Sequence, residues 1–260
     1  MKSNRKNKQY TSFDDEDFLL ENFRLTRSSR IKYFGRFFQC TRVKWLLKSF
    51  LFKKSWINSS ADSRPDFHND KHRIMMEMMR IDDCVGERNG KQVPNSFKRK
   101  DLYFRKHLGN KYEDLLKSCT LFFNADTTND DEFNFEGYFK NFKKVLMKHS
   151  EKVDAYHSNY PKCKKCILFI FDESNAYYQE GPLNGNLNKI NLIHTCFLDK
   201  QFIDVIKQCK SDFVVWFTFN KTILNEKQKE IKRTLACIYD IKHMRRKGIT
   251  YDYRKMRKIV

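Results

Sequence analysis

The chain has 260 residues, of which 40% are hydrophobic, including 24 Phe, so it can bury a sizeable core and a disordered chain is excluded. No stretch approaches the roughly 18 to 20 uncharged apolar residues that a membrane-spanning helix needs. The basic start of the chain leads into acidic residues 14–17 rather than an apolar segment, so no secretory signal is expected. These features predict a soluble, cytoplasmic protein.

The formal net charge of +20 is concentrated at the two ends of the chain. Residues 1–60 hold 14 Lys and Arg against 5 Asp and Glu, and residues 221–260 hold 13 against 4, so each end carries +9. The central residues 61–220 carry only +2. Lysine and arginine bind phosphates with release of counterions, which makes nucleic acid the expected partner. The alternative is that the charge only keeps the surface solvated.

The predicted elements alternate between helix and strand along the chain. Residues 1–12 are predicted to be a disordered basic tail, residues 13–60 a basic helical extension with helix over 13–54, and residues 221–260 a basic helical segment. Within the core domain, the apolar patterns predict strands over 74–81, 120–123, 166–171 and 213–218, and helices over 96–119, 135–156 and 198–209, the last with Asp199 as its N-cap. This order predicts an α/β domain over 61–220, with a mainly parallel or mixed sheet and flanking helices.

Acidic residues follow three of the predicted strands. Asp82 and Asp83 follow the first, Asp126 the second, and Asp172 with Glu173 the third, whereas the fourth ends near Lys221. The carboxyl ends of parallel strands meet at one edge of a sheet, where open α/β sheets bind ligands. Carboxylates gathered there would suit Mg²⁺ or Mn²⁺. The alternative is that these residues only form turns.

A second acidic pattern is formed by Pro65-Asp66 and Glu77. Metal-dependent nucleases of the PD-(D/E)XK class place such an Asp and an acidic residue on neighbouring strands, where they hold the metal that polarises the phosphate, with a nearby Lys. Here Met79 stands where that pattern has Lys, and Arg80 follows on the other face of the strand. Lys71 is the expected substitute. The pattern thus predicts Asp66, Glu77, Asp172 and Glu173 as metal ligands, and Lys71 or Arg80 facing the scissile phosphate.

The chain has eight Cys, of which only Cys163 and Cys166 are closely spaced. A structural zinc site needs four ligands, and the sequence has no second pair with this spacing, so zinc is not the expected metal. The other cysteines stand in apolar or helical contexts, as free thiols do in reducing compartments.

Three elements resemble a group of bacterial proteins that have no assigned activity. They are residues 64–67 (RPDF), residues 74–83 (IMMEMMRIDD) and residues 171–177 (FDESNAY), and the resemblance covers residues 64–220. It implies no function, but it draws attention to positions that largely coincide with the acidic edge: Asp66, Glu77, Arg80, Asp82, Asp83, Asp172, Glu173 and Tyr177.

The leading functional hypothesis is a metal-dependent nuclease-like protein that acts on nucleic acid. In it Asp82, Asp83, Tyr177 and Lys221 would contact the substrate, and the two basic ends would hold the flanking backbone. One alternative is a non-catalytic nucleic-acid-binding or complex-assembly protein that uses the same basic ends. A second alternative is a protein that associates with a membrane surface through residues 31–54, where Phe, Trp and Leu alternate with Lys and Arg.

Overall fold

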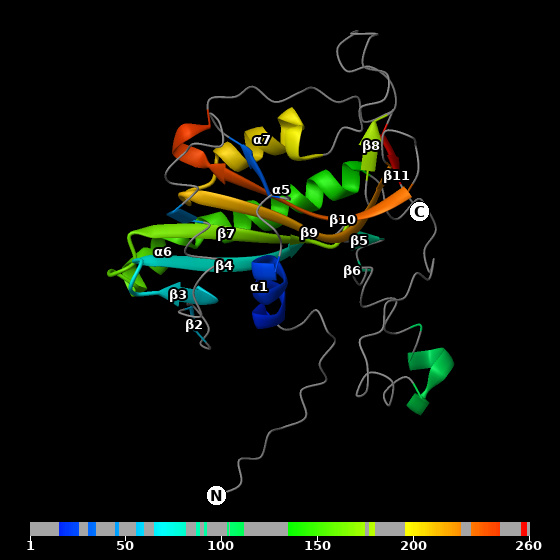
Figure 1. Cartoon of the computed structure of the whole chain (residues 1–260), viewed down its shortest axis with the longest axis horizontal. Helices are drawn as coiled ribbons and strands as arrows, with labels where there is room; N and C mark the ends of the chain where they lie inside the picture. The colour runs from blue at the N-terminus through cyan, green and yellow to red at the C-terminus, as the bar shows by residue number, and fades with distance from the viewer. Residues whose placement is uncertain are drawn as a thin grey trace, which may run out of the picture.

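The computed structural model describes a three-layer α/β/α arrangement (Figure 1). The described residues are 16–25, 31–34, 45–46, 56–59, 65–81, 87–88, 91–92, 103, 105–111, 135–174, 177–179, 196–224, 230–244 and 256–258. A mixed sheet forms the middle layer, and helices pack on both of its faces. The predicted fold class, α/β with a mixed sheet and flanking helices, is confirmed.

The sheet has seven strands in the order β1-β10-β9-β7-β4-β3-β2. Its centre is formed by three parallel strands, β4 (Ile74–Ile81), β7 (Lys165–Asp172) and β9 (Phe213–Leu224). On one side β2 (Ile57–Asn58) and β3 (Phe67–Asn69) extend β4 as an antiparallel meander. On the other side β10 (Glu230–Asp240) pairs antiparallel with β9, and β1 (Ile31–Phe34) pairs parallel with β10.

Two small sheets accompany the main one. β5 (Glu87–Arg88) pairs with β6 (Lys91–Gln92), and β8 (Tyr177–Gln179) pairs with β11 (Met256–Lys258), both antiparallel. The second pair brings residues from near the C-terminus back to the segment that follows β7.

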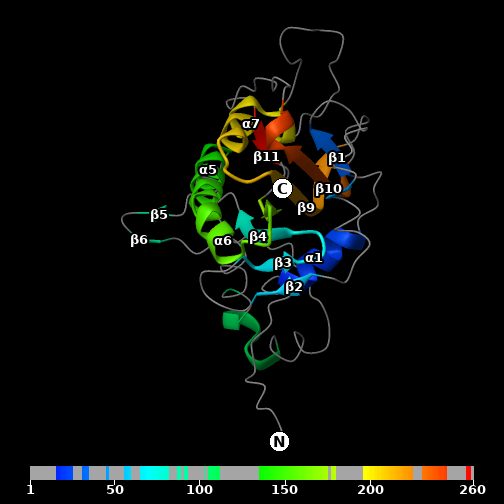
Figure 2. The ribbon, with the colours of Figure 1, turned by 90° about the vertical axis from the view of Figure 1, so that its left-hand side faces the viewer.

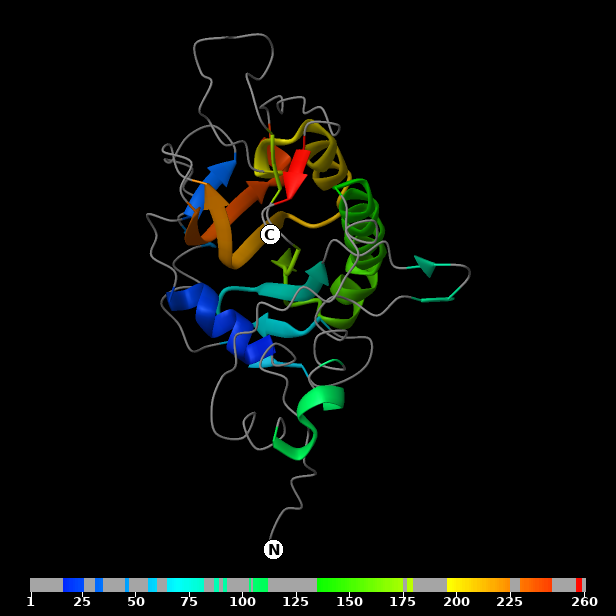
Figure 3. The ribbon, with the colours of Figure 1, turned by 90° about the vertical axis from the view of Figure 1, so that its right-hand side faces the viewer.

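The helices that connect the parallel strands cover one face of the sheet. α5 (Phe135–Glu151) and α6 (Val153–Asn159) lie between β4 and β7, and α7 (Lys200–Lys207) lies between β7 and β9. Both crossovers step across the sheet in the same direction, and because such connections are nearly always right-handed, their helices share a face. α1 (Glu16–Leu25) packs on the opposite face, as Figures 2 and 3 show from two sides.

Each face of the sheet buries its own aromatic core. Under α5 and α7, Trp216 lies at the centre, with the rings of Phe142, Phe197 and Phe202 at 4.7, 4.9 and 5.3 Å from it. Under α1, Phe23 meets Phe169 and Phe217 edge to face at 5.3 and 5.4 Å. Burial on both faces explains why β7 and the first half of β9 are apolar at nearly every position.

Most predicted elements of the core domain are confirmed. The strands predicted over 74–81, 166–171 and 213–218 are β4, β7 and β9, and the helix predicted over 135–156 is α5 with α6. Asp199 caps α7 as predicted, and its carboxylate accepts from the backbone N–H groups of Gln201 and Phe202. Residues 105–108 are helical within the predicted helix over 96–119, whereas residues 120–123 and the tail over 1–12 lie outside the described residues.

Two predictions of helix were wrong. Residues 230–240, expected to be helical, form β10, and residues 31–34, within the expected helix over 13–54, form β1. Residues 236–240 are all buried. From the sequence alone, a short apolar run can be a segment of a buried helix or a strand that is covered on both faces. The pairing of β10 with β9 and β1 decides between them. Both basic ends therefore contribute strands to the same sheet as the central region.

The segment that suggested membrane association is described only in part. Residues 31–34 lie in the sheet, and Leu46 is fully buried in the core on the α1 side. No helix among the described residues is long and apolar enough to cross a membrane.

Candidate functional site

Asp66 and Glu77 lie at the open end of the β3–β4 hairpin. The register of the two strands ends with Phe67 paired to Met76, and Asp66 and Glu77 are the residues that follow this pair on the two sides of the hairpin. Asp66 Oδ2 accepts a hydrogen bond of 2.6 Å from the backbone N–H of Met78, which ties the acidic side chain to β4. The hairpin thus brings together the two carboxylates of the nuclease-like pattern.

Glu77 is a buried carboxylate with a histidine and a lysine beside one oxygen and, among the described residues, no partner at the other. Its side chain is 5% exposed. Oε1 lies 2.7 Å from Nδ1 of His149 and 3.9 Å from Nζ of Lys152, both at the junction of α5 and α6. Among the described residues no group hydrogen-bonds to Oε2. A buried carboxylate oxygen without a donor is costly, so this atom is suited to an additional ligand.

Tyr156 of α6 completes the surroundings of the pair. Burial raises the pKa of its hydroxyl well above the ordinary value, and the negative charges of Glu77 and Asp66 raise it further. The hydroxyl therefore stays protonated and can donate. The charges of Asp66 and Glu77 thus both act on the Tyr156 hydroxyl.

The two cations predicted for this site lie elsewhere. Lys71 is exposed in the turn between β3 and β4. Arg80 points away from Glu77 on the strand, as expected, and its Nε and Nη2 bind Oε1 of Glu173 at 2.9 and 2.6 Å. The structure instead places His149 and Lys152 beside Glu77. The sequence carried a signal for them, since residues 149, 152 and 156 recur at spacings of three and four, on one face of a helix.

Asp172 and Glu173 do not join the Asp66–Glu77 pair. Glu77 is in register with Leu168, four residues before Asp172, which corresponds to about 13 Å along the strand. Asp172 is 3% exposed and accepts three hydrogen bonds: Oδ2 from Tyr138 and from the indole of Trp216, both at 2.8 Å, and Oδ1 from the backbone N–H of Ser174 at 2.9 Å. Burial and then the charge of Asp172 raise the pKa of Tyr138. This carboxylate connects α5 to the sheet.

The remaining predicted site residues are described incompletely. Asp82, Asp83 and Asp126 lie outside the described residues. Tyr177 and Lys221 lie in β8 and β9, but their side chains are outside the described part. Among the residues that the structure does describe, no three or more His, Cys, Asp or Glu side chains are grouped to hold a metal ion. The predicted four-carboxylate metal site is therefore not assembled from its described members.

Cys163 and Cys166 are buried free thiols. Burial raises the pKa of both, so at neutral pH they are thiols rather than the thiolates that bind metals. Cys166 Sγ lies within the core, beneath α5 and α7.

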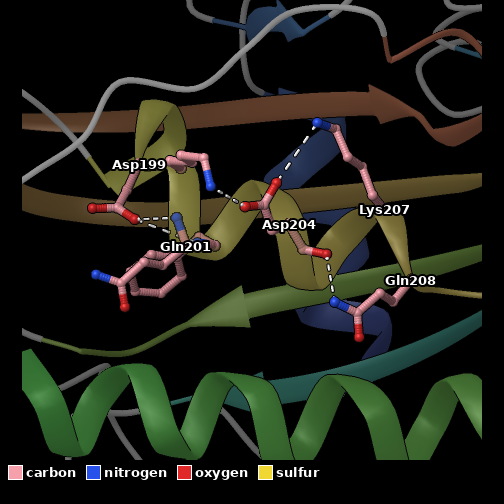
Figure 4. A network of polar contacts seen from close by, with 7 residues as sticks. Asp199, Gln201, Asp204, Lys207 and Gln208 are labelled. Atoms are coloured by element: carbon pink, nitrogen blue, oxygen red, sulfur yellow. Dashed lines mark hydrogen bonds and ion pairs between the residues drawn. The ribbon is translucent and has the colours of Figure 1, made fainter.

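A third buried carboxylate, Asp199, belongs to the N-terminus of α7. Figure 4 shows its hydrogen bonds to the first turn, together with the polar contacts of Asp204 with Lys207 and Gln208 further along the helix. Burial raises the pKa of Asp199 to about 6, although the two backbone hydrogen bonds lower it. Asp199 Oδ2 has no hydrogen-bond partner among the described residues. Unlike Glu77, Asp199 already has the role of a helix cap.

The chain matches no protein-family model, no curated protein and no solved structure.

Proposed function

We propose that the protein is a metal-dependent nuclease-like hydrolase of nucleic-acid phosphodiesters, with Asp66 and Glu77 at its centre. The observation that carries the proposal is the position of these carboxylates at the open end of the β3–β4 hairpin, with the unpartnered Oε2 of Glu77 near Lys152, His149 and the phenol of Tyr156. Magnesium is commonly bound through only one or two carboxylates, with water and substrate phosphate as its other ligands. Two carboxylates with one unpartnered oxygen fit that requirement.

The residues around the pair support distinct roles. Asp66 and Glu77 would hold Mg²⁺ or Mn²⁺, which supplies Lewis-acid polarisation of a phosphoryl oxygen. His149 bonds Glu77 through Nδ1, and a proton on Nδ1 leaves Nε2 as the basic nitrogen that can take a proton from water. Lys152, whose side chain is 47% exposed, would place its charge beside the phosphate.

The experiment incubates the purified chain with labelled single- and double-stranded DNA and RNA, in Mg²⁺, in Mn²⁺ or in EDTA. The test variant is Asp66→Asn/Glu77→Gln, and the control is Glu151→Gln, an exposed carboxylate at the end of α5. Unfolding midpoints are measured beside activity. The proposal predicts metal-dependent cleavage that the control retains and the double variant loses while folded. Cleavage that is equal in the double variant would overturn the site assignment.

A second candidate, a non-catalytic nucleic-acid-binding or assembly protein, is favoured by one observation. Glu77 is 5% exposed, so a phosphate needs movement of α6 or of neighbouring side chains to reach it. In this candidate Asp66 and Glu77 only connect the hairpin to α5 and α6. Binding without cleavage, equal in the wild type and the double variant, would select it.

A further inference from the structure

The near-neutral central region carries a cluster of cations at one end of the sheet. Four exposed side chains form it: Lys71 and Arg73 from the β3–β4 turn, and Lys162 and Lys164 from the segment that leads from α6 into β7. We call this cluster the basic edge. It lies at the left-hand end of Figure 1, where α6 passes into β7.

The two segments of the basic edge are joined through the backbone. The carbonyl oxygen of Arg73 accepts from the N–H groups of Lys164 and Lys165, at 2.8 and 3.3 Å. Arg73 Nε donates to the carbonyl oxygen of Lys162 at 3.2 Å. Cations about 90 residues apart in the sequence are thus fixed side by side, so the cluster is a product of the fold rather than of local composition.

Arg73 occupies an unusual backbone conformation. Its φ of 53° lies in the left-handed region, and no other described non-glycine residue has a positive φ. Glycine or asparagine is the usual residue there, because a larger side chain brings its Cβ too close to the backbone. The fold alone would therefore favour Gly at position 73. An arginine held there at the expense of backbone strain points to a role for its charge.

The charges of the basic edge are not neutralised by the protein. Among the described residues none of the four cations forms an ion pair, whereas the nearby Lys210 is paired with Asp154 and Lys165 lies over the ring of Trp45 at 4.0 Å. The only carboxylate within the two segments is the exposed Asp70. Unpaired like charges held close together repel one another, and an external anion relieves that repulsion.

We propose that the basic edge binds the phosphate backbone of nucleic acid and holds it beside the Asp66–Glu77 pair. Lys165, which follows the edge, is in register with Ile74, three residues before Glu77, so the cluster begins about 10 Å along the strands from the carboxylates. The four members are charged and strongly polar, which suits a phosphate backbone rather than insertion into a lipid surface. The inference rests on the proposed function for the identity of the polyanion, but not for any chemical step.

The first test measures binding in EDTA, where cleavage is absent. The variant Lys71→Gln/Lys162→Gln/Lys164→Gln is compared with a matched control, Lys143→Gln/Lys144→Gln/Lys148→Gln, which removes three exposed lysines from α5. We expect the edge variant to bind duplex DNA at least about tenfold more weakly and to lower the slope of log affinity against log salt by about 2 to 3, one unit for each lost phosphate contact. The control should change both quantities much less. Equal losses in the two variants would overturn the inference.

The second test uses Arg73→Gly, which relieves the backbone strain and removes the charge. We expect its unfolding midpoint to equal or exceed that of the wild type while nucleic-acid binding weakens. Unchanged binding by Arg73→Gly and the edge variant would contradict the inference. The inference would also be contradicted if these variants lost binding only to vesicles of phosphatidylserine in phosphatidylcholine and still bound nucleic acid normally.

The two proposals fail in different ways. If wild-type protein cleaves nucleic acid but the edge variant binds normally, the nuclease proposal stands and the proposal that the basic edge binds nucleic acid is wrong. If the edge variant loses binding but no condition gives cleavage, the basic edge stands and the nuclease proposal is wrong.

Discussion

Glu77 and Asp172 are both buried carboxylates on the same face of the sheet, beneath α5 and α6, yet their surroundings differ. Asp172 accepts hydrogen bonds on both oxygens, from Tyr138, Trp216 and the backbone of Ser174. Glu77 has His149 and Lys152 at one oxygen and no hydrogen-bond donor, among the described residues, at the other. A buried carboxylate whose two oxygens both accept hydrogen bonds stabilises the fold. A carboxylate with an unpartnered oxygen, beside a second acid and a cation, has the capacity to accept a further ligand.

The largest expected effect is on the activity of Glu77→Gln. Loss of a metal-holding charge removes several kcal/mol of transition-state stabilisation, so cleavage should fall on the order of 10³-fold. The amide can still accept from His149, so the free energy of unfolding should change by about 1 kcal/mol or less. Single-turnover cleavage and urea unfolding of the same preparation measure both. A large loss of stability would mean that Glu77 is structural like Asp172.

Asp172→Ala should show the reverse pattern. Tyr138 and Trp216 would each lose their buried acceptor, which costs about 1–3 kcal/mol apiece, so the free energy of unfolding should fall by about 2–5 kcal/mol. Cleavage per folded molecule should stay close to that of the wild type. Asp172→Asn, which keeps one acceptor oxygen, should lose less stability. If Asp172→Ala instead abolishes cleavage at full stability, the contrast between the two carboxylates is wrong.

A smaller effect is expected for Lys152→Gln. Its ammonium lies 3.9 Å from Glu77 Oε1 but is half exposed, so its electrostatic contribution is screened. A loss of about 1–2 kcal/mol of transition-state stabilisation corresponds to a roughly tenfold fall in cleavage. Lys148→Gln, one turn earlier and exposed, is the matched control. Equal activity of Lys152→Gln and wild type would remove Lys152 from the site.

The last effect concerns Asp199, outside the candidate site, and depends on pH. Because its pKa of about 6 in the folded state lies above the ordinary value of 3.8, protonated Asp199 favours folding, and that stability is lost as the pH rises from about 4 through 6. Asparagine caps a helix as well as aspartate and cannot ionise. We expect Asp199→Asn to be more stable than wild type by about 1–3 kcal/mol at pH 8 and no more stable at pH 4. Thermal unfolding at the two pH values measures this. If Asp199→Asn were more stable than wild type only at pH 4, the predicted direction of the pH dependence would be wrong.

The core of the fold was predictable because its signals are local. β4, β7 and β9 are apolar runs of strand length, and α5 carries a helical stripe from Phe135 to Leu146. β10 and β1 were not predicted as strands because their pairing is decided by partners distant in the chain. For the same reason the sequence could not reveal the register of β4 and β7. That register pairs Glu77 with Leu168, four residues before Asp172.

The candidate site was predictable in its acids but not in its cations. Asp66 and Glu77 were singled out by the spacing of the Pro-Asp and Glu pattern, and both lie at the open end of the β3–β4 hairpin. His149 and Lys152 come from a helix more than 70 residues later, and only the packing of α5 on β4 brings them to Glu77. Arg80 was placed correctly on the opposite face, but its ion pair with Glu173 needed the register of β4 and β7.

Mn²⁺ binding tests the central claim most directly, because it does not require a known substrate. The loss of the free-ion EPR signal of Mn²⁺ is titrated with wild type, with Asp66→Asn/Glu77→Gln and with the control Glu151→Gln. We expect saturable Mn²⁺ binding by wild type and control that the folded double variant lacks. Equal binding by the double variant, or no binding by the wild type, would contradict the assignment of Asp66 and Glu77 as metal ligands.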